Sequence, residues 1–183
     1  MKKLTFIAAA AVATVATPAF AQDMGDADNG GLFVGAVGGY DTVQLEDTLS
    51  GEDADDQGVL YGVTAGFDID TGRTIIGIEG EVTDTTISDD VGDAGLDIYG
   101  GLRLGYEMDD NDIIYIKGGY TNVDIEGFDN LEGVRVGAGF EHNFGVFIGR
   151  LEYRYSNYNI EDVLGDGLNG NRHQVAATIG AKF

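Results

Sequence analysis

The feature that most constrains this chain is a strict alternation of apolar with small or polar side chains. The last segment, residues 172–183, shows it clearly. Its apolar row consists of Val175, Ala177, Ile179, Ala181 and Phe183. Successive side chains of a β-strand point to opposite faces, so this alternation predicts a strand with one face against an apolar phase.

Seven earlier segments repeat the alternation. They are residues 32–43, 59–67, 75–83, 96–106, 113–121, 133–141 and 147–156. Each has roughly the ten residues that a tilted strand needs to cross a bilayer. Long polar connections at residues 45–56, 84–94, 122–132 and 157–170 alternate with short ones. This rhythm is typical of an up-and-down barrel with short periplasmic turns and longer external loops, so the predicted fold class is all-β, an eight-stranded antiparallel up-and-down transmembrane β-barrel.

The first 21 residues have the three parts of a secretory signal peptide. Lys2 and Lys3 form a positive start, residues 4–16 are apolar, and Ala19-Phe20-Ala21 is a small-residue cleavage motif. We therefore expect cleavage between Ala21 and Gln22. Residues 22–30 are polar and predict a mobile N-terminal tail. Residues 31–183 are predicted to form the barrel.

Composition excludes several functions. Removal of Lys2 and Lys3 with the signal leaves eight basic against 32 acidic side chains, a net charge of −24. Such a charge disfavours any nucleic-acid partner. The chain has no cysteine, so thiol chemistry and cysteine-based metal sites are excluded. No metal ligand set and no cofactor are predicted.

The polar row of the strands carries charges of both signs with glycines beside them. The predicted charge network consists of Glu79, Glu81, Asp97, Arg103, Lys117, Arg135, Glu141, Arg150, Glu152 and Arg154. Arg172 and Lys182 fall on the same row. An unpaired charge away from water costs several kcal/mol, so matched signs indicate an enclosed lumen rather than a solvated face. In the alternative, a soluble lipocalin-like carrier, the apolar row would point inward.

Aromatic residues gather near both ends of the apolar row, as in the two girdles of a membrane barrel. The predicted girdle residues are Tyr40, Phe67, Tyr106, Tyr120, Phe140, Phe147, Tyr155 and Phe183. Tyr61 lies on the same row near the loop side.

With these residues in place, the chain resembles the small eight-stranded outer-membrane β-barrels. These include the OmpA transmembrane domain, OmpX and the opacity-type, porin-like surface proteins. The segments that carry the resemblance are GLFVGAVGGY in the first strand, GIEGEV in the third, VGAGFE in the sixth, LEYRY in the seventh and the terminal Phe183. The resemblance implies a location in the bacterial outer membrane, contact with outer-membrane lipid, and recognition of Phe183 by the β-barrel assembly machinery.

Catalytic readings find little support in the sequence. His142 falls in a predicted short turn, and His173 begins the last strand. Outer-membrane lipid A deacylases, another small-barrel family, carry a serine two residues after their histidine, where this chain has Val175. The long loops are rich in Asp and Glu without Lys or Arg, so they are solvated acidic segments with divalent cations as candidate partners.

The function predicted from the sequence is an integral outer-membrane barrel that is structural and surface-exposed, not an enzyme, with acidic interaction loops. Its lumen is expected to be plugged by charged side chains, because eight strands leave room only for side chains. Three alternatives stay open: a narrow porin-like diffusion channel, an enzyme acting on surface lipid, and the soluble periplasmic lipocalin-like carrier.

Overall fold

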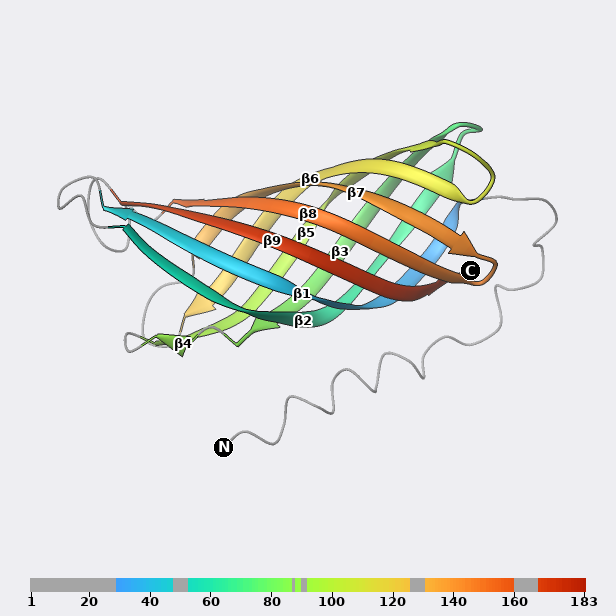
Figure 1. The fold of residues 1–183 in the computed structure, drawn as a ribbon. Coiled ribbons are helices and arrows are strands. Elements are labelled where there is room, and N and C mark those ends of the chain that lie inside the picture. Colours follow the sequence, from blue (N-terminus) through green and yellow to red (C-terminus); the bar gives the residue numbers. More distant parts are fainter. Residues whose placement is uncertain (1–28, 48–52, 87, 90–91, 126–130, 160–167) are drawn as a thin grey trace.

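The computed structural model describes residues 29–47, 53–86, 88–89, 92–125, 131–159 and 168–183. The predicted signal peptide lies outside these residues. Nine strands are seen in the described part of the chain (Figure 1). Their bounds are β1 (Gly31–Asp47), β2 (Asp53–Asp70), β3 (Thr74–Thr85), β4 (Ser88–Asp89), β5 (Gly92–Glu107), β6 (Asp112–Ile125), β7 (Leu131–Phe144), β8 (Phe147–Asn159) and β9 (Leu168–Lys182).

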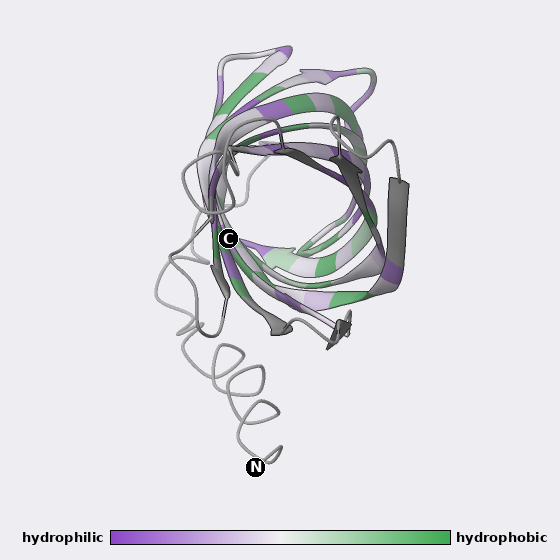
Figure 2. Ribbon diagram, turned by 90° about the vertical axis from the view of Figure 1, so that its left-hand side faces the viewer, coloured by the Kyte–Doolittle hydropathy of each residue, from purple (hydrophilic) through white to green (hydrophobic). Residues whose placement is uncertain are grey.

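Eight of these strands close into a barrel. Each pairs antiparallel with the strand that follows it around the wall, and β1 pairs with β9. The ring is completed where β3 pairs with β5, from Thr74 opposite Tyr106 to Thr83 opposite Asp97. The two-residue β4 pairs only with the start of β5. The view along the axis shows the closed ring of strands (Figure 2). The predicted fold class is confirmed.

The strands are longer than the sequence pattern predicted. The eight strands of the barrel have 12 to 18 residues, whereas the alternation indicated roughly ten. The first predicted loop is the clearest correction, because β1 continues to Asp47 and β2 starts at Asp53. Where water reaches both faces of a sheet, neither row of side chains has to be apolar, and backbone hydrogen bonds alone can continue the strand pairing. The strands therefore continue past the point where the apolar alternation stops.

Short turns join the strands at the end of the barrel where the C-terminus lies (Figure 1). The connections are residues 71–73, 108–111 and 145–146. Gly72 and Gly145 have φ angles of 105° and 80°, which favour glycine over residues with a side chain. The last turn begins later than predicted, so His142 lies within β7 and not in a turn.

The apolar row faces outward on every barrel strand. In β3 the burial alternates residue by residue, with Ile76 and Ile78 exposed and Glu79 and Glu81 buried. Outward side chains such as Leu102 and Ile179 are 65% and 75% exposed. A water-soluble protein does not surround itself with such a continuous apolar surface. The soluble-carrier alternative is therefore wrong, because it requires the opposite orientation.

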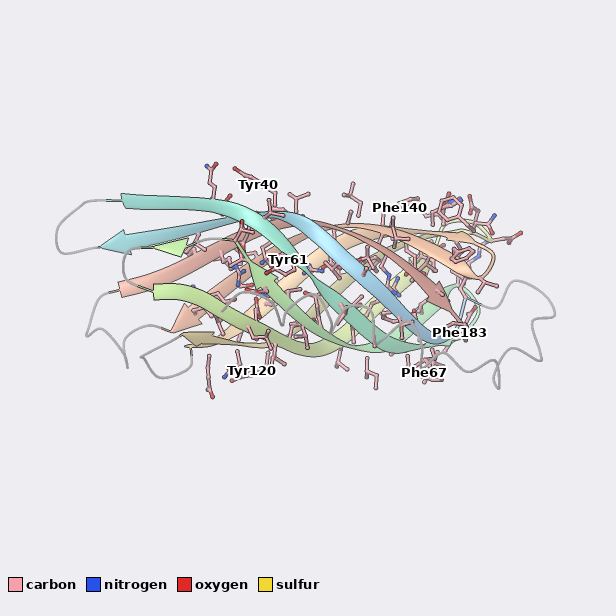
Figure 3. The ribbon with its side chains drawn as sticks, turned by 90° about the horizontal axis from the view of Figure 1, so that it is seen from below. Tyr40, Tyr61, Phe67, Tyr120, Phe140 and Phe183 are labelled. Atoms are coloured by element: carbon pink, nitrogen blue, oxygen red, sulfur yellow. The ribbon has the colours of Figure 1, made fainter. Side chains whose placement is uncertain are left out.

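The predicted girdle aromatics lie on this outward row. Tyr40, Phe67, Tyr106, Tyr120, Phe140 and Phe147 are exposed, and Tyr155 and Phe183 are half-buried. Phe67, Phe140 and Phe183 lie near the turn end, and Tyr40, Tyr61 and Tyr120 lie toward the loop end (Figure 3). On the loop side, β1 runs on for seven residues past Tyr40, which is about 23 Å of strand.

Candidate functional site: the charged interior of the barrel

The interior of the barrel contains a charge-balanced set of ionisable side chains, which we call the interior network. Its acidic members are Asp41, Asp68, Glu79, Glu81, Asp97, Glu141 and Glu152. Its basic members are Arg103, Lys117, Arg135, Arg150, Arg154, Arg172 and Lys182. All fourteen are at most 5% exposed. Seven negative and seven positive groups sum to zero, as a water-poor interior requires.

At the turn end, Glu141 on β7 collects three cations. Its carboxylate oxygens lie 2.8 Å from Arg103 Nη2, 2.6 Å from Arg150 Nε and 2.8 Å from Lys182 Nζ. Asp68, from the end of β2, accepts from Arg103 Nη1 at 2.6 Å and from Lys182 Nζ at 3.0 Å. Five residues from five different strands thus hold this end of the barrel together.

The middle of the network is centred on Lys117 of β6. Its Nζ lies 2.6 Å from Glu79 Oε1 and 2.7 Å from Glu152 Oε1. Arg150 Nη1 donates to the other oxygen of Glu79 at 2.9 Å, which connects this group to the turn end. Arg154 holds both oxygens of Glu81, at 2.5 and 2.7 Å. A two-pronged contact of this kind fixes geometry as well as charge.

Toward the loop side, Asp97 of β5 lies between two arginines. Arg135 Nη2 donates to Asp97 Oδ2 at 2.5 Å, and Arg172 Nη1 donates to the same atom at 2.8 Å. Arg172 also pairs with Asp41 of β1 through its Nε and Nη2. Arg135 Nη1 lies 3.6 Å from Glu81, so the network is continuous along the bore.

Aromatic rings stack on cations of the interior network. The Arg103 guanidinium lies 4.1 Å from the ring centre of Tyr115, and Arg150 lies 3.9 Å from that of Phe33. Lys117 Nζ is 4.9 Å from the ring centre of Tyr99. Cations over aromatic faces gain electrostatic energy that increases when water is excluded.

Inward glycines of the polar row make room both for these rings and for charged side chains. A Cβ on Gly101 would lie 2.2 Å from the Tyr99 hydroxyl. A Cβ on Gly139 would lie 2.6 Å from the Tyr115 ring. Two others face charged side chains: a Cβ on Gly77 would lie 2.2 Å from Asp68 Oδ1, and one on Gly137 would lie 3.3 Å from Lys117.

Asn29 occupies the turn end of the bore and was not anticipated as a site residue. Its backbone N–H donates to Asp70, its amide donates to Glu107 at 2.5 Å, and its carbonyl accepts from Lys182 at 3.0 Å. Asn143 also donates to its side-chain oxygen. Asn29 is 4% exposed, so this residue belongs to the barrel and not to a mobile tail. Residues 22–28 of the predicted tail lie outside the described residues.

All ten interior residues named from the sequence lie in the interior network, together with Arg172 and Lys182. The sequence reading missed Asp41, Asp68 and the two tyrosines that stack on cations. Asp41 stands on the inward row of β1, where its alternation with Phe33 and Val37 was available as a signal. Asp68 lies one residue past the predicted end of its strand, which explains its omission.

The two histidines do not enter the bore. His142 Nδ1 pairs with Asp112 near the turn end, and its ring lies 4.4 Å from that of Phe144. His173 Nδ1 lies 2.7 Å from the Tyr153 hydroxyl on the outer face.

Among the residues that the structure describes, no group of His, Cys, Asp and Glu is arranged to hold a metal ion. The acidic side chains predicted for the long loops, Asp84 and Glu132 apart, lie outside what the structure describes. Within the described chain there is also no helix long and apolar enough to cross a bilayer.

A closed barrel with an apolar exterior and an ion-paired interior defines an integral membrane β-barrel. Residues 7–183 match the family model described as "Outer membrane protein beta-barrel domain", and the chain belongs to that family. Its members lie in the bacterial outer membrane. The predicted family resemblance is thereby confirmed.

The chain is similar to solved structures at low sequence identity. Neisserial surface protein A (NspA) is 15% identical, with a TM-score of 0.51, and the alignment covers 83% of this chain and 97% of that one. The attachment invasion locus protein Ail of Yersinia pestis, solved with the heparin analogue sucrose octasulfate, is 13% identical, with a TM-score of 0.47. That alignment covers 82% and 99% of the two chains. Comparison with curated proteins finds no match.

Proposed function

We propose that this protein is a non-conducting outer-membrane barrel that holds acidic segments at the cell surface. The main observation that supports a closed bore is the interior network, which runs without a break from Asp68 and Lys182 to Asp41 and Arg172. An ion or solute would have to displace several buried ion pairs to pass. Removing one partner from a buried pair costs about 3–5 kcal/mol, so such displacement is rare at ordinary temperature.

The turn end has a second obstruction in Asn29. This residue connects Asp70, Glu107, Asn143 and Lys182, which come from four strands around the rim. Its hydrogen bonds place backbone across the mouth of the bore. Both features support a plugged lumen whose role is mechanical stability rather than transport.

The loop side supports a surface role. Strands β1 and β2 continue past the aromatic residues Tyr40 and Tyr61 as a paired ribbon, with Glu46 opposite Asp53. The segments on this side are acidic in sequence and contain no Lys or Arg. Raised above the lipid on rigid strands, such segments are presented to the exterior, where divalent cations are candidate partners.

The remaining proposed partners concern membrane insertion. The outward apolar row contacts outer-membrane lipid. The last strand is followed by Phe183, whose backbone pairs with Leu32 through hydrogen bonds of 2.7 and 2.9 Å and so helps to join the first and last strands. We infer that this closing strand is the part read by the β-barrel assembly machinery. We propose no catalytic activity.

Planar-bilayer recording of the refolded protein tests the closed bore. We expect no steady unitary currents from the wild-type chain, with insertion verified by its heat-modifiable migration on a gel. Asn29→Ala should give at most brief events, because the interior network remains. Steady open levels in the wild type would refute the plugged lumen and favour the second candidate, a narrow diffusion channel. That candidate has one observation in its favour: the buried Tyr99 hydroxyl has no protein hydrogen-bond partner among the described residues.

A further inference from the structure

A shallow groove lies on the outer face of the barrel near the turn end. Its volume is about 490 Å³. It is lined on the outside by Thr74, Leu104, Tyr106, Ile114, Ile116 and Ala138. Leu104 and Ile116 are 50% and 59% exposed, which places the groove on the apolar, lipid-facing surface. The register puts Ala138 opposite Ile116 on one side and Tyr153 on the other, so a short side chain stands between two long ones.

Arg73 stands at the turn end of this groove. It immediately precedes Thr74, and its Nη1 donates to the Tyr106 hydroxyl at 3.4 Å. The backbone holds Arg73 in place, because its carbonyl accepts from the Glu107 N–H at 3.0 Å. The guanidinium is exposed and takes part in none of the ion pairs found among the described residues.

Arg73 differs from every other basic residue after the predicted signal. The other seven belong to the interior network and are buried there. The one basic side chain outside that network therefore adjoins the apolar groove, beside a tyrosine at the level of lipid headgroups. Exposed arginine recognises phosphate through charge-assisted hydrogen bonds, and interfacial tyrosine lies at the headgroup level.

We propose that Arg73, Tyr106 and the groove form a binding site for one glycerophospholipid of the leaflet on the turn side, which faces the periplasm. The phosphate accepts hydrogen bonds from Arg73 and the Tyr106 hydroxyl. One acyl chain lies along Leu104, Ile114 and Ile116 and fills the space above Ala138. The groove is within the size range of small-ligand sites. Acidic residues of this rim, Glu107 beside Arg73 among them, repel anions, so the guanidinium of Arg73 fixes where the phosphate binds.

Native mass spectrometry of the full mature chain in mild detergent, titrated with phosphatidylglycerol, tests the site. Arg73→Gln should weaken binding of the first lipid about fivefold, the factor expected for one basic side chain near lipid phosphate. Arg73→Lys should retain most of the affinity because it keeps the charge. Ala138→Leu should weaken binding to a similar extent by filling the groove.

Ala177→Leu is the matched control, because Ala177 is also an exposed alanine of the outward row but lies on β9, away from the groove. It should bind as the wild type does. All variants should retain the heat-modifiable gel shift of a folded barrel. The site is overturned if Arg73→Gln binds as the wild type does. It is equally overturned if Ala138→Leu and Ala177→Leu are indistinguishable, since headgroup attraction without a groove is then sufficient.

Discussion

Arg135 offers the sharpest test of whether charge matching stabilises the barrel. It is fully buried, donates to Asp97 at 2.5 Å and to Ser156 at 2.9 Å, and lies 3.6 Å from Glu81. Arg135→Leu leaves seven negative against six positive interior groups. Asp97 keeps Arg172 as a partner at 2.8 Å, so the cost should fall at the lower end of the range for a broken buried pair, about 3 kcal/mol.

The double variant distinguishes charge balance from simple loss of packing. Asp97→Asn alone leaves an excess positive charge and should also cost about 3 kcal/mol. Arg135→Leu combined with Asp97→Asn restores equal numbers of interior charges. The combined cost should then stay near 3 kcal/mol instead of reaching about 6, a coupling of the size seen between contacting residues.

The assay is urea unfolding of the protein refolded into lipid vesicles, followed by tyrosine fluorescence, because the chain has no tryptophan. A loss of about 3 kcal/mol moves the midpoint by roughly 1–3 M. Asp84→Asn is a control, since Asp84 lies on the outer face and pairs with the Tyr61 hydroxyl; it should change stability by no more than about 0.5 kcal/mol. If the Arg135→Leu midpoint equals that of the wild type, or if the two single effects add, the reasoning is wrong.

Three further predictions concern the wall and the turn end of the barrel. Gly101→Ala should lower the free energy of unfolding by about 1–3 kcal/mol, because its Cβ would lie 2.5 Å from a backbone oxygen. Gly100→Ala is the control. It should not change stability in the same urea titration, because its Cβ would meet nothing within 4 Å. Leu102→Arg, on the lipid-facing surface, should cost about 2–4 kcal/mol in vesicles, whereas Met108→Arg in a turn should cost almost nothing. Asn29→Ala should lower the free energy of unfolding by about 1–3 kcal/mol, because it leaves buried hydrogen-bond partners unsatisfied. An unfolding midpoint equal to that of the wild type, read from the heat-modifiable gel shift, would contradict this.

The strands could be predicted because every second side chain of a membrane-spanning strand faces lipid and is therefore apolar. Ile76, Ile78 and Leu102 face lipid and are apolar, so their strands stand out in the sequence. Beyond the membrane this alternation is no longer required. β1 continues to Asp47 on backbone pairing alone, and an acidic stretch without an apolar row resembles a loop.

The membership of the interior network was partly predictable, but its pairing was not. Arg154 pairs with Glu81, 73 residues away in sequence, because the two side chains reach across the bore from β8 and β3, which lie on opposite sides of the ring. Alternation gives the face of a residue and not its height along the barrel. The role of these glycines could not be predicted either, because Gly101 and Gly139 make room for tyrosine side chains rather than for charged ones.

The neutrality of the bore decides where the charge of the molecule lies. Seven of the 32 acidic residues belong to the interior network, which leaves 25 elsewhere. After removal of the predicted signal, Arg73 is the one Lys or Arg residue outside the network to balance these 25 acidic residues. The acidic side chains that the structure describes outside this network lie near the two ends of the barrel, so a negative field arises there, and each end collects a counterion atmosphere about 8 Å thick at physiological salt. Neighbouring copies in a crowded membrane repel one another through these atmospheres, so dilution of salt should spread them apart and added multivalent ions should draw them together.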